Sequence, residues 1–266
     1  QFNYVICVAW NEGKMIRLDA ARPYNGFGNV SEECYNGYAR IINEERPYLV
    51  DFDADSTQET KITSVFLVND DKGKCTGSFQ SILGAVESYK LREEVKKTSE
   101  KDYFKKVQTN YGSDLTIQSP GIDSLKSLDN PAIVRYDLDM KDMFTADVVY
   151  FNPMLAEVYK TNPFKSMERH YPVEMPYKME ETYVLSMDIP KGYQVDEMPK
   201  SARVAYNETE GMFEYLIQKG PSNIQMRVHI KFNKAVFPTE EYATLRDFFG
   251  YVVKKENEQI VFKKIP

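Results

Sequence analysis

The sequence predicts a mainly β protein with a minor helical part, an α+β chain. Aromatic residues make up 13% of the 266 residues, with 19 Tyr and 15 Phe, and aromatic side chains favour strands. Several segments alternate apolar and polar residues, most regularly from Ile224 to Phe232, which predicts strands with one buried and one solvated face. Apolar residues recur at helical spacing in only two short segments. The length has room for about two domains.

The N-terminal residues predict a β-hairpin. Residues 2–10 and 14–20 have strand character, and Asn11-Glu12-Gly13 predicts the turn between them. Because the chain starts at Gln1 within a predicted strand, we expect further residues upstream in the natural protein. The absence of a signal peptide from this sequence therefore indicates nothing about location.

The middle of the chain mixes strand and helix signals. Strand character returns at 61–68 after the polar, acidic residues 51–57. A long strand is predicted from Phe79 to Leu91, where apolar residues share one parity. A helix is predicted near 99–111, where Ser99 fits an N-cap and Gly112 a C-terminal cap.

The segment from about residue 166 onward has the strongest β pattern. We predict an antiparallel β-sandwich over 166–266 with one covering helix that begins after Pro238. Ile260 to Phe262 is predicted to close the sheet.

Charge and cysteine content exclude several classes of protein. With 40 acidic and 34 basic residues and a net charge of −6, the chain lacks the basic surface of a nucleic-acid binder. It contains no apolar run near the ~18 residues that span a bilayer. Cys7, Cys34 and Cys75 form no C-x-x-C pair, so we expect three unpaired thiols, mostly buried, and no cofactor or metal.

The histidines and the acidic segment are the other candidate site residues. His229 lies on the polar parity of the most regular strand and is expected to point into water. His170 stands alone and is expected to be structural, because a zinc site needs several ligands. Asp51, Asp53 and Asp55 resemble the start of a calcium loop. Ser56 and Ile62 replace the Gly and Glu that an EF-hand requires, so a solvated linker is favoured and a weak calcium site is the alternative.

The first hairpin resembles the end of a transglutaminase-like domain, a papain-like Cys-His-Asp fold. The resemblance is carried by residues 2–6, the turn at 11–13 and residues 17–20. In that family a histidine lies on one strand and an aspartate about 15 residues later, so Asp19 matches the aspartate and Tyr4 replaces the histidine. If the hairpin closes tightly, Ile6 pairs with Asp19, and Tyr4 lies diagonally on the same face within reach of it.

The replacement of histidine by tyrosine has a chemical consequence. A cysteine nucleophile needs a neighbour that accepts a proton near neutral pH, and a phenol with a pKa near ~10 does not. The family's cysteine would lie upstream of this chain. Cys7 is not an obvious substitute, because its parity places it on the face opposite Tyr4 and Asp19.

The resemblance extends to the segments that follow. Gly26-Phe27-Gly28 and Cys34-Tyr35-Asn36-Gly37 are similar to the region after this domain in multidomain bacterial proteins. Residues 169–173, 189–193 and 241–249 resemble their C-terminal β domain of unknown function. The implied organisation is a transglutaminase-like remnant (1–55), a β-rich middle module (56–165) and the sandwich (166–266), in a periplasmic, cell-surface or secreted protein.

Three functional hypotheses follow. The first is a non-catalytic binding or structural module whose partner is a protein or glycan of the cell envelope. The second is the specificity part of an active thiol hydrolase, of protease or transglutaminase type, whose cysteine lies upstream. The third, a calcium-dependent adhesion module, depends only on the acidic segment 51–55.

Overall fold

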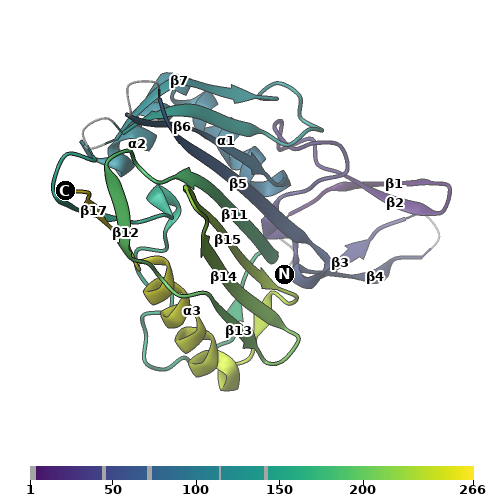
Figure 1. Ribbon diagram of the computed structural model, residues 1–266. Helices are drawn as coiled ribbons and strands as arrows, with labels where there is room; N and C mark the ends of the chain where they lie inside the picture. The colour runs from purple at the N-terminus through teal and green to yellow at the C-terminus, as the bar shows by residue number, and fades with distance from the viewer. Residues whose placement is uncertain (1–3, 44–45, 71–73, 114, 141–142) are drawn as a thin grey trace.

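A computed structural model describes residues 4–43, 46–70, 74–113, 115–140 and 143–266. These residues form a mainly β structure with minor α content, so the predicted fold class is confirmed. Within them, eight strands make one mixed sheet (Figure 1). Across the sheet the strands are β13 (Ala202–Tyr206), β14 (Gly211–Lys219), β15 (Asn223–Phe232), β11 (Lys178–Asp188), β5 (Gln58–Asn69), β6 (Cys75–Leu83), β8 (Ile133–Asp139) and β7 (Thr116–Asp123).

The sheet joins the two segments that the sequence predicts as separate modules. Among the described strands, residues 56–165 and 166–266 contribute four each. The two halves meet where β11 runs parallel to β5, with Tyr183 opposite Thr63. All the other neighbours in this sheet are antiparallel. Within 166–266 the strands of this sheet pair antiparallel, as predicted, and the parallel contact of β11 is with β5, which lies outside that segment.

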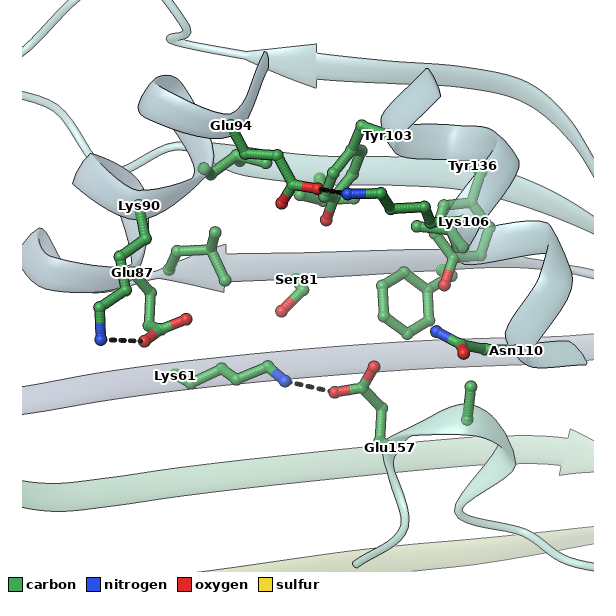
Figure 2. Close-up of a pocket in the computed structure, with 16 residues that line it drawn as sticks. Lys61, Ser81, Glu87, Lys90, Glu94, Tyr103, Lys106, Asn110, Tyr136 and Glu157 are labelled. Carbon is green, nitrogen blue, oxygen red and sulfur yellow. Dashed lines mark hydrogen bonds and ion pairs between the residues drawn. The ribbon is translucent and has the colours of Figure 1, made fainter. Parts of the chain in front are cut away.

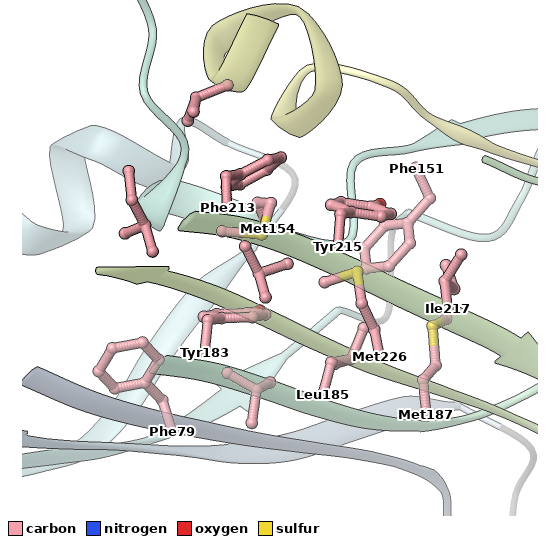
Figure 3. Packing of buried hydrophobic residues seen from close by; sticks show 14 of the residues in the cluster. Phe79, Phe151, Met154, Tyr183, Leu185, Met187, Phe213, Tyr215, Ile217 and Met226 are labelled. Carbon is pink, nitrogen blue, oxygen red and sulfur yellow. The ribbon is translucent and has the colours of Figure 1, made fainter. Parts of the chain in front are cut away.

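One face of the sheet carries the core. Alternate residues of the central strands point to this face, where Phe151 and Met154 pack over them (Figure 3). A small sheet lies on the same side and contains β12 (Tyr193–Glu197), β17 (Ile260–Lys264) and β9 (Val148–Phe151). The strand predicted at Ile260 to Phe262 is present as β17, but it belongs to this small sheet, so the expectation that it closes the main sheet is wrong. The core on this face contains Phe79, Tyr183, Leu185, Met187, Phe213, Tyr215, Ile217 and Met226.

The predicted C-terminal helix is present as α3 (Tyr242–Glu256). Its apolar stripe packs on β13 and β15 through aromatic contacts: the Phe248 ring centroid lies 5.2 Å from that of Phe232, and Phe249 stacks on Phe232 at 5.7 Å. The remaining short elements of the described chain are β10 (Val173–Glu174), β16 (Val236–Phe237), η1 (Glu32–Cys34), η2 (Ala54–Ser56), η3 (Leu155–Glu157) and η4 (Thr239–Glu241).

Two helices cover the other half of the core face. α2 (Glu100–Tyr111) confirms the predicted helix: the Ser99 hydroxyl accepts the Asp102 N–H at 3.0 Å, and Gly112 follows the last turn. α1 (Ala85–Lys97) occupies residues that the sequence predicts as a continued strand, which is a correction.

The chain leaves the strand at Gly84 because of a contact that is distant in sequence. The buried Glu59 carboxylate on β5 accepts the Val86 and Glu87 N–H groups at 3.1 and 2.8 Å, which caps the N-terminus of α1. A Cβ at Gly84 would lie 2.5 Å from the Glu59 carboxyl carbon. Only glycine therefore allows this close approach.

The loop between β7 and β8 is organised around one buried cation. Arg92 of α1 donates to four backbone carbonyls, those of Ser124, Ser127, Leu128 and Asn130, at 2.7 to 3.4 Å. This loop in turn binds the N-terminal part of the chain, because the Asp129 carboxylate accepts the Phe27 N–H at 2.8 Å.

Residues 4–53 form two hairpins that extend from one side of the main sheet (Figure 1). The first joins β1 (Cys7–Asn11) to β2 (Lys14–Leu18) and confirms the predicted turn, since Glu12 and Gly13 both have positive φ. The second joins β3 (Asn36–Ile41) to β4 (Tyr48–Asp53).

The opposite face of the main sheet carries polar clusters and exposed apolar residues such as Phe66. His229 lies on this face, as its parity predicts, but it is only 9% exposed, so the expectation that it points into water is wrong. Its Nε2 lies 3.1 Å from a Glu180 oxygen, and the other Glu180 oxygen contacts Lys231 at 3.1 Å and Gln58 at 2.6 Å. This polar cluster covers the imidazole.

Candidate functional site

The hairpin brings Tyr4 and Asp19 together as the sequence predicts. Cys7 pairs with Leu18, so one further step along the register puts Ile6 opposite Asp19. The Tyr4 hydroxyl donates to Asp19 Oδ2 at 2.8 Å, and Asp19 Oδ1 accepts the Ala21 N–H at 3.1 Å. Both oxygens of the aspartate are thereby engaged, one by the phenol and one by the backbone.

A thiol that the sequence analysis did not connect with this pair lies beside it. Cys34 is half-buried, and burial raises its pKa to about 11, with further contributions from the charges of Asp19 and Glu33. Burial and the hydrogen bond to Asp19 raise the pKa of Tyr4 as well. The cluster thus contains a thiol, a phenol and a carboxylate, and the thiol and phenol are both neutral near pH 7.

No local signal links Cys34 to Asp19. Fifteen residues and an irregular loop separate them, and the loop is held by Arg22, which reaches Tyr89 on α1 at 3.4 Å and Glu33 at 3.2 Å. Only the folded loop places the thiol near the carboxylate.

The three thiols are expected to differ sharply in reactivity. All three are unpaired, as predicted, but Cys7 is exposed and only Cys75 is buried, which corrects the expectation that most are buried. Burial raises the pKa of Cys75 to about 12. Because the thiolate is the reactive form, iodoacetamide at pH 8 should label Cys7 about 100-fold faster than Cys34, with Cys75 slowest.

Peptide mass spectrometry of timed samples measures the three rates, and labelling in denaturant, where the three should react alike, is the control. Labelling of Cys34 as fast as that of Cys7 would contradict the raised pKa and make Cys34 a candidate nucleophile.

Two of the other predicted candidates, Asp53 and Asp55, have structural contacts. Asp53 caps η2 by accepting the Ser56 N–H at 3.0 Å, and Asp55 accepts the backbone N–H of Ala235. His170 is exposed. In the part of the chain that the structure describes, no group of three or more His, Cys, Asp or Glu residues is arranged to hold a metal ion.

One cavity is a cleft between α1, α2, η3 and the core face of β5, β6 and β8, called here the helix cleft (Figure 2). Its volume is about 360 Å³. Polar and charged groups of four elements converge on it: Lys61 of β5, Ser81 of β6, Asn110 of α2 and Glu157 of η3.

Ion pairs surround the helix cleft. Lys61 pairs with Glu157, and Lys106 with Glu94. Lys90 lies 3.5 Å from Glu87 and 3.2 Å from Glu32. Burial alone would lower the pKa of Lys61, but the charges of Glu157 and Glu181 raise it overall, so this lysine stays protonated.

A smaller cavity of about 30 Å³ lies on the other side of the Lys61–Glu157 pair. It is lined by two carboxyl groups whose pKa values burial raises: Glu181, and Glu256, whose pKa reaches about 8. Glu256 accepts the Tyr159 N–H at 2.8 Å and is held on α3. The Lys61–Glu157 pair therefore lines both the helix cleft and this smaller acidic cavity.

The described residues form a mainly β structure that contains a polar cleft and a thiol–phenol–carboxylate cluster. Residues 147–262 match the family model of DUF3858, a domain of unknown function for which a structure has been solved. This match overlaps the predicted C-terminal segment 166–266 and is compatible with a transglutaminase-like protein without confirming one. No curated protein matches the chain.

One solved structure has a weak likeness to the chain. It is described as a "putative protease" from Parabacteroides distasonis ATCC 8503, with 15% sequence identity and a TM-score of 0.38. The likeness covers 46% of this chain and 24% of the other. The chain thus spans about a quarter of that protein, and a likeness this low carries no argument about activity. None of the described helices has the length and apolarity needed to cross a membrane.

Proposed function

We propose that this chain is a non-catalytic binding or structural module of an exported, transglutaminase-like protein. The observation that supports this most directly is the hydrogen bond from Tyr4 to Asp19 at 2.8 Å. In a working Cys-His-Asp site the aspartate orients an imidazole that accepts the proton of the thiol. Here a phenol with a raised pKa takes that position, and it cannot serve as a base near neutral pH.

The neighbouring thiol supports the same proposal. With a pKa of about 11, Cys34 is almost entirely protonated at pH 7, and the thiolate is the nucleophile in this chemistry. We propose a protein or glycan of the cell envelope as the partner of this module, and a periplasmic, cell-surface or secreted location for the protein.

A second candidate is the specificity part of an active thiol hydrolase. The geometry around Asp19 favours it, because the carboxylate is still oriented by the Ala21 N–H as a working aspartate would be. This candidate requires a cysteine and a base from outside the chain.

The two candidates predict different results in acyl-transfer and peptide-hydrolysis assays of the full-length parent protein. We expect the parent and its Tyr4→Phe variant to be silent. The Tyr4→His variant supplies an imidazole at Asp19 and should gain activity if a thiol is within reach. Activity of the unmodified parent would contradict the proposal and favour the thiol hydrolase.

A further inference from the structure

We infer that the helix cleft is a binding site for a neutral sugar residue of a glycan. The inference rests on the proposed function, since it names the ligand class of a binding module. It extends that function by assigning the ligand to the cleft between α1, α2 and η3, about 360 Å³ in volume.

The charges around the cleft disfavour an ionic ligand. Among the described residues that line it, three lysines and three glutamates balance in charge. Each of the six has a partner in the protein: Lys61 with Glu157, Lys90 with Glu87, and Lys106 with Glu94. The lining therefore has no net charge that would attract an ionic ligand, which favours a neutral one.

The same groups keep hydrogen-bonding capacity for a neutral polyol. An ammonium group has three protons and a carboxylate about four acceptor positions, so an ion pair does not exhaust either. Ser81 and Asn110 add uncharged donors and acceptors between the pairs (Figure 2). Adjacent sugar hydroxyls can each donate and accept a hydrogen bond, so they suit a rim that carries both donors and acceptors.

The floor of the cleft is apolar and aromatic. Phe79 stacks on Tyr136 with ring centroids 4.4 Å apart, and Val134 and Leu83 lie beside them. A pyranose ring has an apolar C–H face and hydroxyls at its edge, so it fits an apolar floor within a polar rim. The volume is at the lower end of the ~300–1,000 Å³ of ligand sites, which suits one or two sugar rings.

The walls of the cleft are held in place before any ligand binds. Leu155 has a positive φ of 54°, which is unfavourable for a residue with a branched side chain, and it starts the turn that presents Glu157 to Lys61. Two lining hydroxyls are held by residues outside the cleft: Tyr136 is hydrogen-bonded to Tyr111 at 2.6 Å, and Ser81 to Thr63 at 3.0 Å. Pre-organisation of this kind lowers the cost of binding.

The test is to titrate the chain with the methyl glycosides of glucose, galactose, mannose and N-acetylglucosamine. Binding is measured from the chemical-shift changes of the backbone amides in NMR spectra. We expect at least one to bind with a millimolar Kd and to shift residues around the cleft. Lys106→Ala and Asn110→Ala should each weaken binding about tenfold. Lys105→Ala and Thr109→Ala, on the same helix but outside the cleft, should change it by less than about twofold.

Three outcomes would overturn the inference. No glycoside at about 50 mM shifts the amide signals of residues around the cleft, or the two pairs of variants change the Kd equally. The third is that a dipeptide such as alanyl-alanine binds there more tightly than every sugar. These failures are distinct from failure of the proposed function. If the cleft binds no sugar but the parent protein is inactive, the proposed non-catalytic function still stands. If the parent is active, the proposed function is refuted, whatever the cleft binds.

Discussion

Replacement of Arg92 by methionine is expected to lower the free energy of unfolding by about 3 to 5 kcal/mol. The guanidinium is buried and donates to four carbonyls of the loop between β7 and β8. Methionine fills much of the volume but leaves these carbonyls without their donor. Chemical denaturation followed by circular dichroism measures the loss.

The matched control for Arg92 is Arg135→Met. Arg135 is exposed and pairs with Asp123 at 2.9 Å, and such surface pairs contribute about 0 to 1 kcal/mol. The Arg92→Lys variant should recover part of the stability, because an ammonium can reach some of the four carbonyls but lacks the planar fork. Equal losses in the two methionine variants would show that the loop does not depend on Arg92.

Wild-type protein is expected to lose stability as the pH rises from about 4.5 to about 8, and Glu256→Gln should remove most of that loss. Glu256 is 2% exposed, and burial, together with the charges of Glu181 and Glu157, raises its pKa to about 8. In the unfolded chain the same carboxyl releases its proton near its ordinary pKa of 4.5. Because the folded state holds the proton more tightly, deprotonation at higher pH favours unfolding.

The expected loss in the free energy of unfolding is a few kcal/mol, since each unit of pKa shift corresponds to about 1.4 kcal/mol. Urea unfolding at pH 5, 6.5 and 8 tests this: the glutamine variant should match wild type at low pH and exceed it at pH 8, because the amide oxygen still accepts the Tyr159 N–H. Glu240→Gln, an exposed control, should follow wild type at each pH. If both variants follow wild type, Glu256 is not the group responsible for the loss of stability at higher pH.

The local features of the fold could be predicted from the sequence. The hairpin register that joins Tyr4 to Asp19 depends only on a short turn and on period-two alternation. The alternating strands of the C-terminal half and the Ser99 cap of α2 are likewise encoded within a few residues.

Features built from distant segments could not be predicted in this way. The β6–α1 boundary depends on Glu59, some 25 residues earlier in the chain, whose carboxylate caps the helix. His229 has the parity the sequence indicates, but its burial depends on Glu180 from a neighbouring strand. The helix cleft combines side chains from several separate elements, and none of them forms a recognisable motif alone.

The parallel contact between β5 and β11 affects the order in which the molecule can form. β5 is synthesised long before β11, with Lys178 opposite Gln58 at one end of their register and Met187 opposite Leu67 at the other. Until β11 emerges, the nascent chain holds β5 with an unpaired backbone edge, and such edges are templates for association between chains. Residues 147–262, produced without β5, would expose the matching edge of β11, so we expect this segment alone to associate through that edge.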